Sequence, residues 1–274
     1  MFWVVGIYNL FENGILNLIR QRTAPGEVGE AALVGCGFAF CILVAYLLGS
    51  VNWALVISKL FYHDDVREHG SGNAGTTNVL RTYGKKAAAL TFLGDGLKGV
   101  LAIVVACAVF GYPFAYSEVS GGIYYDVHYI HLITAAYLAA FFAVFGHVFP
   151  CFSKFRGGKG FATFLFSALA LNPAIFLILI TVFLVLVLGA HYVSLGSVVT
   201  VAFYPILLHS FDQAISHYGI GTLFAFAIAA LVIWSHRTNI KRLLSHTESK
   251  TYFFKKKPKG EEGAPAAPTG EDAE

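Results

Sequence analysis

A lysine set among three glycines is the part of this sequence best suited to binding a phosphate group. The run Gly157-Gly158-Lys159-Gly160, here called the glycine loop, follows a short basic stretch and precedes a long apolar segment. Glycines allow consecutive backbone N–H groups to converge on one anion, and the lysine adds a cation. A Walker A nucleotide site is not predicted, because Gly160 stands where Ser or Thr should follow the lysine. The alternative interpretation is a tight helix-capping turn.

A second polar stretch, residues 64–81, has a similar composition. Arg67 and Arg81 can add charge-assisted hydrogen bonds to a phosphate. The small polar residues between them can build an anion-binding concavity: Gly70, Ser71, Gly72, Asn73 and Asn78. A flexible linker is the alternative, but linkers rarely mix arginine with repeated glycine and asparagine.

A third group follows the last apolar segment. Helical spacing places His236 and Asn239 on one face, with Arg242 near them. A basic juxtamembrane stop signal would account for the arginines of this region but not for His236 or Asn239. Asp95 and Lys98 lie three residues apart inside another apolar segment, where they can pair. The sequence leaves a structural and a catalytic role for that pair equally open.

The elements that position these groups are membrane-spanning helices. The chain has 274 residues, of which 57% are hydrophobic and 13% charged, and residues 160–211 contain no Asp, Glu, Lys or Arg. Fifty-two helical residues exceed two bilayer thicknesses. We predict an all-α integral membrane protein, a bundle of about seven transmembrane helices with an interfacial N-terminal helix and three functional cytoplasmic loops. The predicted crossings are residues 31–59, 86–111, 130–149, 158–171, 173–190, 195–210 and 218–236.

Three regions follow from this pattern. Residues 1–30 are expected to form an interfacial segment, residues 31–250 the membrane domain, and residues 251–274 a disordered cytoplasmic tail. Lys and Arg concentrate in loops 60–85 and 150–160 and after residue 236, whereas loops 112–129 and 211–217 contain neither. The positive-inside rule therefore places the loaded loops and the C-terminus in the cytoplasm and the N-terminus outside.

Taken together, these motifs resemble the acyl-phosphate:glycerol-3-phosphate acyltransferases of bacterial membranes, the PlsY family. The resemblance covers about residues 49–250 and rests on short runs that occur in the same order: Gly49-Ser50, Asp65-Val66-Arg67, Gly70–Asn73, Thr77-Asn78, Gly157–Gly160, Ala162-Thr163, Tyr192–Ser197 and His236–Leu243.

The resemblance implies transfer of a fatty acyl group from acyl phosphate to the 1-hydroxyl of glycerol 3-phosphate in the bacterial cytoplasmic membrane, yielding lysophosphatidic acid. It implies catalytic roles for Ser50, Arg67, Lys159, His236 and Asn239. The glycines of the glycine loop, the polar residues of the first loop, Arg81 and Ser194 would bind substrate. Glu248 would brace the third loop.

Other expectations concern partners and cofactors. The partners are acyl phosphate, glycerol 3-phosphate and membrane lipid, with a functional link to an acyl-ACP:phosphate acyltransferase; nucleic acid is not expected. No cofactor or metal is expected, since an acyl phosphate is already activated and the histidines lack metal-ligand spacing. Three positions depart from the family pattern: Asn52 replaces proline, His191 arginine and His246 glycine.

Two alternative functions would share some of these features. An anion transporter would also place cations at membrane-facing loops, but it would more often show two related halves, and no repeat is visible. An acyl-CoA-dependent enzyme that uses His and an Asp five residues later is excluded, because none of the ten histidines has Asp at that distance.

Overall fold

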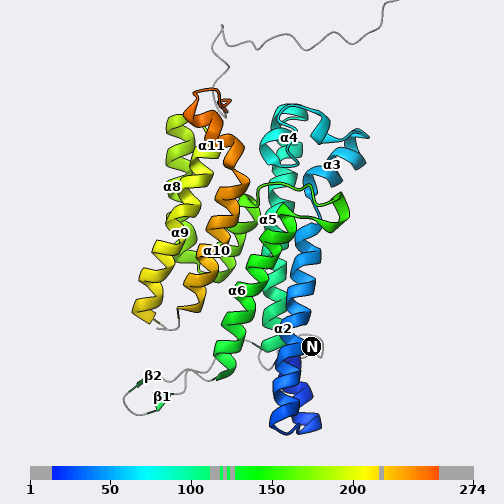
Figure 1. Ribbon diagram of the computed structural model, residues 1–274, viewed down its shortest axis with the longest axis vertical. Helices are drawn as coiled ribbons and strands as arrows, with labels where there is room; N and C mark the ends of the chain where they lie inside the picture. Colours follow the sequence, from blue (N-terminus) through cyan, green and yellow to red (C-terminus); the bar gives the residue numbers. More distant parts are fainter. Residues whose placement is uncertain (1–13, 112–117, 120–121, 124–126, 216–218, 253–274) are drawn as a thin grey trace, which may run out of the picture.

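The computed structural model describes residues 14–111, 118–119, 122–123, 127–215 and 219–252, and these are helical apart from loops and one two-residue strand pair, β1 (Glu118–Val119) with β2 (Gly122–Ile123) (Figure 1). The prediction of an all-α membrane protein is confirmed. Residues 14–23 are helical. The helices that follow are α2 (Glu27–Ser50), α3 (Trp53–Tyr62), α4 (Thr76–Thr82), α5 (Lys85–Phe110), α6 (Val127–Val148), α7 (Phe161–Leu171), α8 (Pro173–Ala190), α9 (Val193–Ile215), α10 (Ile220–Ser235) and α11 (Arg237–Leu244), with 3-10 turns η1 (Val66–Glu68) and η2 (Cys151–Ser153).

Five helices in the described part of the chain are long and apolar enough to cross a membrane. A sixth span results if α10 and α11, which meet at a 59° bend, are counted together. The fourth predicted crossing, residues 158–171, is only the 11-residue helix α7. At 1.5 Å per residue α7 reaches about 16 Å, roughly half of a bilayer core. The predicted number of seven crossings is therefore not confirmed.

The prediction that residues 31–59 form one continuous crossing is wrong. Helix α2 ends at Ser50, and the chain turns through extended conformations at Val51 and Asn52 before α3 begins. Asn52 caps α3, because its side-chain oxygen accepts a hydrogen bond from the Leu55 amide at 3.0 Å. Such a cap stabilises a new helix start and so favours two helices over one.

Small residues let α2 and α6 cross closely. A methyl group added at Gly49 would overlap the carbonyl oxygen of Ala143, and one added at Gly146 would overlap that of Tyr46. Helix α5 packs on α2, α6 and α7, and α8 to α10 form the other side of the molecule, where α9 packs on α8 and α10 (Figure 1). Close approach through glycine and alanine is a common means of helix association in membranes.

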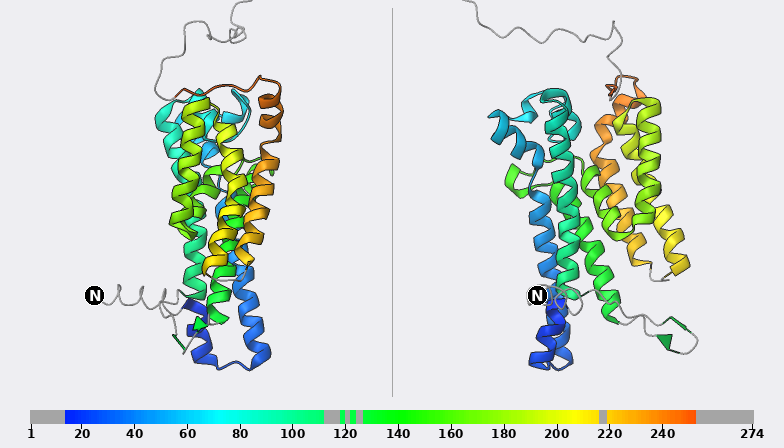
Figure 2. Two further views of the ribbon diagram at one scale, coloured as in Figure 1. Left: turned by 90° about the vertical axis from the view of Figure 1, so that its left-hand side faces the viewer. Right: turned by 180° about the vertical axis from the view of Figure 1, so that it is seen from behind.

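The three polar loops lie at one end of the bundle, and helix 14–23 lies at the other (Figures 1 and 2). This agrees with the predicted grouping of the loops. The helix of residues 14–23 packs on the bundle, since Leu16 is buried against Gly37 and Phe110. Residues 1–13, the rest of the predicted interfacial segment, lie outside the described residues.

The boundary of the predicted tail shifts by two residues. Thr251 donates its backbone N–H to the carbonyl of His191 at 2.8 Å, and the Tyr252 ring lies 4.8 Å from the His191 ring. Residues 251 and 252 therefore belong to the folded domain. Residues 253–274, the remainder of the predicted tail, lie outside the described residues.

Candidate active site

The glycine loop is shaped by the end of α6. The Gly158 amide donates to the carbonyl of His147 at 3.1 Å, and a methyl group at Gly157 would overlap that same carbonyl oxygen. Gly160 has φ +81°, a conformation that disfavours L side chains, and it is the N-cap of α7. The loop thus leads directly into a helix N-terminus, where free amides and the helix dipole favour an anion.

Lys159 connects the glycine loop to the third loop, residues 236–252. Its ammonium group donates to the side-chain oxygen of Asn239 at 2.5 Å. The amide nitrogen of Asn239 donates in turn to Glu248 Oε1 at 2.6 Å. Asn239 therefore uses both ends of its amide to fix Lys159 and Glu248 relative to one another.

The Glu248 carboxylate accepts hydrogen bonds from three side chains. Besides Asn239, Ser194 Oγ donates to Glu248 Oε1 at 2.7 Å, and Arg242 Nε donates to Oε2 at 2.6 Å. Burial works to raise the pKa of Glu248, but the hydrogen bonds from Ser194, Asn239 and Arg242 outweigh it and hold the pKa below its usual value. Glu248 thus connects Ser194 of α9 with Asn239 and Arg242 of α11, and its role as a brace for the third loop stays a prediction. Arg242 was not predicted as a site residue.

The charge on Lys159 is easier to lose than that of an ordinary lysine. Burial is the main cause that lowers the pKa of Lys159 to about 8. Attraction to Glu248 works in the opposite direction, while the cations of Arg242 and Arg81 favour the neutral form. An incoming phosphate would add negative charge beside Lys159, which makes this lysine a candidate ligand for an anion.

His236 lies at the bend between α10 and α11 and is buried. Its Nδ1 lies 2.8 Å from the carbonyl oxygen of Val232. A carbonyl only accepts, so Nδ1 carries the proton, and in the neutral ring Nε2 is left as an acceptor. Lys159 and Glu248 both act electrostatically on this ring, which places it within their cluster.

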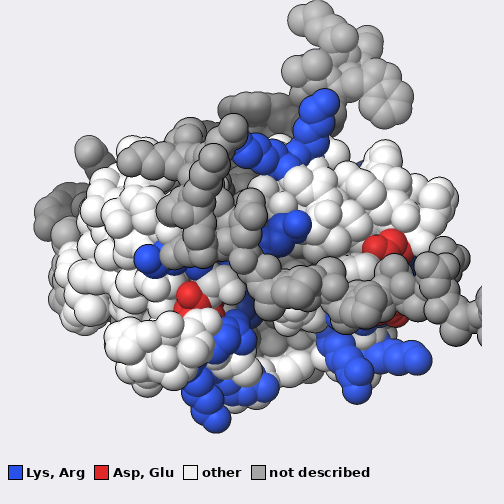
Figure 3. Space-filling model, turned by 90° about the horizontal axis from the view of Figure 1, so that it is seen from above, with Lys and Arg blue, Asp and Glu red and all other residues white. Residues whose placement is uncertain are grey.

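Arg81 ties the first loop to the third. Its guanidinium donates to the carbonyl of Ser249 at 3.3 Å, and its charge acts on Lys159. The glycine loop also approaches the first loop, because a methyl group at Gly158 would lie 2.7 Å from the carbonyl oxygen of Ala74. The three loops are therefore in contact through the residues around Lys159. Seen from above, basic side chains surround this end of the molecule and acidic ones are far fewer (Figure 3).

Asn78, predicted to bind substrate, holds the first loop together in this structure. Its side-chain oxygen accepts from the Ser71 amide at 3.0 Å, and its nitrogen donates to the carbonyls of Val66 and His69 at 2.8 and 3.0 Å. Gly70 and Gly72 have φ +56° and +70° and complete this turn, with Ser71 exposed between them and Asn73 half-buried after them. Asn78 shapes the loop whose amides remain candidates for substrate binding.

Arg67 forms a bidentate ion pair with Asp65. Its Nε and Nη2 lie 3.0 and 2.6 Å from Asp65 Oδ1 and Oδ2. The hydrogen bond from Arg67 is the main cause that lowers the pKa of Asp65, and the same bond raises the pKa of Arg67. Both side chains are partly exposed, so the guanidinium stays accessible to a ligand.

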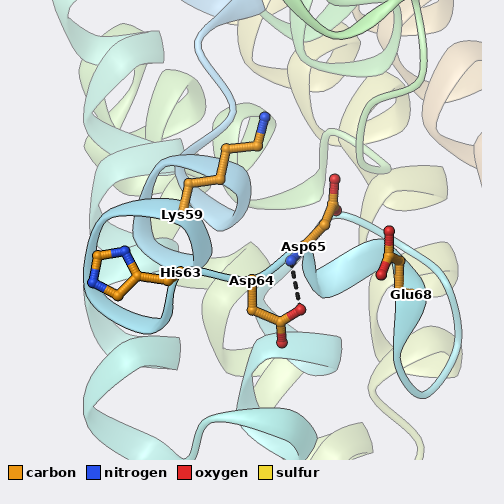
Figure 4. A pocket seen from close by; sticks show the side chains of 5 residues that line it. All are labelled: Lys59, His63, Asp64, Asp65 and Glu68. Carbon is orange, nitrogen blue, oxygen red and sulfur yellow. Dashed lines mark hydrogen bonds between the residues drawn. The ribbon is translucent and has the colours of Figure 1, made fainter.

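An open surface pocket of about 450 Å³ lies where α3 leads into the first loop (Figure 4). It is lined by Lys59, His63, Asp64, Asp65 and Glu68. Three carboxylates among five residues make its charge unsuitable for a phosphorylated substrate. We therefore place the candidate site at Lys159 and not in this pocket.

Ser50 lies at the end of α2 and is fully buried. Its hydroxyl donates to the Tyr46 carbonyl at 2.8 Å and accepts from the Cys151 amide at 3.4 Å. Ser50 thus links α2 to the segment before the glycine loop.

Asn52, which the sequence marked only as a departure from the family pattern, donates to the Ala74 carbonyl at 3.1 Å and so fixes the first loop to the start of α3.

The two other departures stand at residues with a left-handed backbone conformation. His246 has φ +56°, so the glycine that is usual there would adopt this backbone conformation without strain. His191 has φ +63° and ends α8. Its carbonyl accepts from Thr251, so in this chain the position anchors the third loop.

Comparison with known proteins shows the family of this chain. The family model described as glycerol-3-phosphate acyltransferase matches residues 39–246. Glycerol-3-phosphate acyltransferase of Clostridioides difficile (strain 630) is 43% identical over 215 residues, 78% of this chain and 96% of that protein. The enzyme of Bordetella pertussis (strain Tohama I) is 39% identical over 230 residues, 83% and 94% of the two chains.

Solved structures give the same result. The crystal structure of PlsY (YgiH), an integral membrane glycerol 3-phosphate acyltransferase, in its glycerol 3-phosphate form is 34% identical, with a TM-score of 0.65 over 78% of this chain and 96% of that one. Its lysophosphatidic acid form is 33% identical, with a TM-score of 0.62. The multi-pass membrane chain built around Lys159, His236 and Glu248 is therefore a member of the PlsY family of glycerol-3-phosphate acyltransferases.

Proposed function

We propose that this protein transfers a fatty acyl group from acyl phosphate to the 1-hydroxyl of glycerol 3-phosphate. The products are lysophosphatidic acid and inorganic phosphate, and the reaction is an early step of bacterial phospholipid synthesis. The observation that carries the proposal is the hydrogen-bonded series Lys159–Asn239–Glu248, which joins the glycine loop to the third loop beside His236. Both substrates are phosphorylated, and this is where cations and free amides meet.

The glycine loop and Lys159 are assigned to the phosphate of the acyl donor. In the transition state the carbonyl carbon of the donor is attacked, and negative charge develops on its oxygen and on the departing phosphate. Lysine and helix N-terminal amides stabilise such charge, and removing one stabilising donor from this kind of site lowers turnover about 10²–10³-fold. An acyl phosphate needs no covalent enzyme intermediate, since phosphate is already a good leaving group.

Arg67 and Arg81 are assigned to the phosphate of glycerol 3-phosphate, together with the amides of residues 70–73. Arginine suits this role because its planar group binds phosphate with two parallel hydrogen bonds. The pair with Asp65 holds Arg67 ready in one orientation until the substrate arrives.

His236 is assigned to the attacking hydroxyl, which would donate its hydrogen bond to Nε2. The proton then passes to Nε2 or to the departing phosphate. Replacement of His236 by Gln, whose amide oxygen accepts a hydrogen bond but takes up no proton, separates these routes. Substantial turnover in H236Q, together with loss in H236A, identifies phosphate as the proton acceptor.

The donor is tested with purified protein and radiolabelled glycerol 3-phosphate. Palmitoyl phosphate, palmitoyl-CoA and palmitoyl-ACP are supplied separately, and the product is identified by mass spectrometry. We expect lysophosphatidic acid with palmitoyl phosphate alone. Equal turnover with palmitoyl-CoA or palmitoyl-ACP would contradict the proposed donor. Dependence on palmitoyl phosphate would also support the proposed functional link with an acyl-ACP:phosphate acyltransferase, the kind of enzyme that makes acyl phosphate.

We also propose that the three loops face the cytoplasm and that the N-terminus lies outside. The support is the distribution of basic residues at the loop-bearing end (Figure 3). Single cysteines placed at Lys241 and Glu27 in a variant lacking the native cysteines, probed with a membrane-impermeant maleimide in intact cells, test this orientation. Labelling at position 241 before cell lysis would contradict it.

A further inference from the structure

Three ionisable side chains lie buried beneath the site, on α5 and α6. Asp95, Lys98 and His147 are 1%, 5% and 4% exposed. Lys98 Nζ lies 3.0 Å from Asp95 Oδ1 and 2.8 Å from His147 Nδ1. Charged groups in membrane helices are expensive unless they are paired, and they mark functional sites by default. The sequence singled out Asp95 and Lys98 without deciding their role, and it did not single out His147.

Lys98 holds the end of α2. Its ammonium donates to the carbonyl oxygens of Gly49 and Val51, both at 2.8 Å. These carbonyls belong to the last turn of α2 and the residue after it, where the next N–H donors of a continuing helix are missing. A cation at a helix C-terminus also matches the negative end of the helix dipole.

Asp95 holds the beginning of α3. Its Oδ1 accepts a hydrogen bond from the Trp53 amide at 3.2 Å, the first amide of α3. The pair therefore caps both sides of the break at residues 51 and 52, with the cation on the carbonyl side and the carboxylate on the amide side. This arrangement explains why the predicted single crossing is two helices.

His147 connects this cap to the glycine loop. An ammonium group only donates, so His147 Nδ1 accepts from Lys98, and the neutral ring carries its proton on Nε2. Nδ1 also lies 3.4 Å from Asp95 Oδ1, and the Lys98 ammonium serves both acceptors. On its other side the ring touches the glycine loop, since a methyl group at Gly158 would overlap Nε2.

We propose that Asp95, Lys98 and His147 form a positioning triad that sets the first loop and the glycine loop at a fixed distance from each other. The break at residues 51 and 52 fixes the first loop, because Asn52 donates to Ala74. The end of α6 fixes the glycine loop, because the His147 carbonyl accepts from Gly158. Lys98 is hydrogen-bonded both to the break, at the carbonyls of Gly49 and Val51, and to the end of α6, at His147. The inference rests on the proposed function, in which these two loops hold the two phosphates.

The triad is tested with two conservative replacements of one ring. In His147→Asn the amide oxygen takes the place of Nδ1 and accepts from Lys98, whereas in His147→Gln the amide lies where Nε2 was. We expect H147N to retain most of the turnover. We expect H147Q to lose about 10²-fold in kcat, the size of effect that follows a displacement of about 1 Å at a reacting centre. The KM for glycerol 3-phosphate should change much less, because Arg67 and Arg81 are untouched.

Amide hydrogen exchange provides a readout that does not depend on the acyl donor. In H147Q, peptides covering residues 149–160 and 70–76 should exchange faster, while peptides of α8 to α10 should be unchanged. Equal activity and equal exchange in H147N and H147Q would overturn the triad, as would equal losses in both. Faster exchange throughout H147Q would also overturn it, because His147 would then support the whole fold. If exchange follows the expectation while palmitoyl phosphate is not a substrate, the triad stands and the proposed donor fails.

Discussion

Two lysines of this protein, Lys98 and Lys159, differ in how many hydrogen bonds their ammonium groups make to the protein. The Lys98 ammonium has four acceptors within 3.0 Å, all of them fixed parts of the protein. The Lys159 ammonium makes a single hydrogen bond in the described structure, to Asn239. An ammonium has three N–H donors, so Lys98 has none left for a ligand whereas Lys159 does. Burial does not distinguish a lysine that only stabilises the fold from one that can bind a ligand. The number of N–H donors that already bind the protein does.

The first way to sharpen this comparison is Lys159→Met. The variant removes the cation from the glycine loop, so kcat/KM should fall about 10³-fold, while the unfolding temperature should hardly change because only one hydrogen bond is lost. Acyl transfer and thermal unfolding in detergent measure the two quantities. Lys154→Met, a nearby replacement at an η2-flanking residue, is the matched control and should leave both near their original values.

The second test is the replacement of Lys98 by methionine. Lys98→Met leaves Asp95 as an unpaired buried carboxylate and two helix-end carbonyls without a donor. Breaking such a pair destabilises a protein by about 3–5 kcal/mol. We expect a clear drop in unfolding temperature, which is the reverse of the Lys159 result. A K98M protein that unfolds at the original temperature would contradict the assignment of Lys98 to the fold.

Arg67 offers a third test, of somewhat smaller effect. Arg67→Ala removes a bidentate phosphate ligand and should raise the KM for glycerol 3-phosphate, with kcat/KM lower by about 10²-fold. Arg156→Ala removes an exposed arginine beside the glycine loop and serves as the control. If R67A and R156A behave alike, Arg67 does no more than neutralise Asp65.

The pH dependence is the smallest of the four effects. The pKa of Lys159 is lowered to about 8, so the free enzyme loses this cation as the pH rises through that value. We therefore expect kcat/KM to decline above about pH 8, by about tenfold per unit once Lys159 is mostly neutral. Bound phosphate stabilises the cation, so the decline in kcat should begin at higher pH. Coincident declines in kcat and kcat/KM would contradict this role.

Much of the site could be predicted because its residues stand in short runs whose composition is unusual for a membrane protein. Gly157–Gly160 and the neighbours of His236 are recognisable without a structure, and the structure joins them through Lys159 and Asn239. The role of Asn78 could not be predicted in this way. An asparagine that binds backbone groups of its own loop and one that binds substrate look the same in a sequence.

The break after α2 and the role of His147 were missed for a different reason. Residues 31–58 contain no charge, and no proline marks the turn at Val51. What stabilises the turn is Lys98, which lies 49 residues beyond Gly49 and reaches it only through the packing of α5 on α2. His147 is one of three histidines in the otherwise largely apolar helix α6, and nothing in the sequence distinguishes it from the other two or indicates its partner. The signal that could have found it is the presence of Asp95 and Lys98 in a neighbouring span.

The central claim, that the glycine loop and the third loop form one catalytic unit, is tested most directly by a double-mutant cycle on kcat/KM. The variants are Lys159→Met, Asn239→Ala and the two combined, all assayed with the same donor. Because Asn239 acts by holding Lys159, we predict that the double variant is little worse than K159M alone. Independent losses that multiply in the double variant would show that the two loops act separately and would contradict the account.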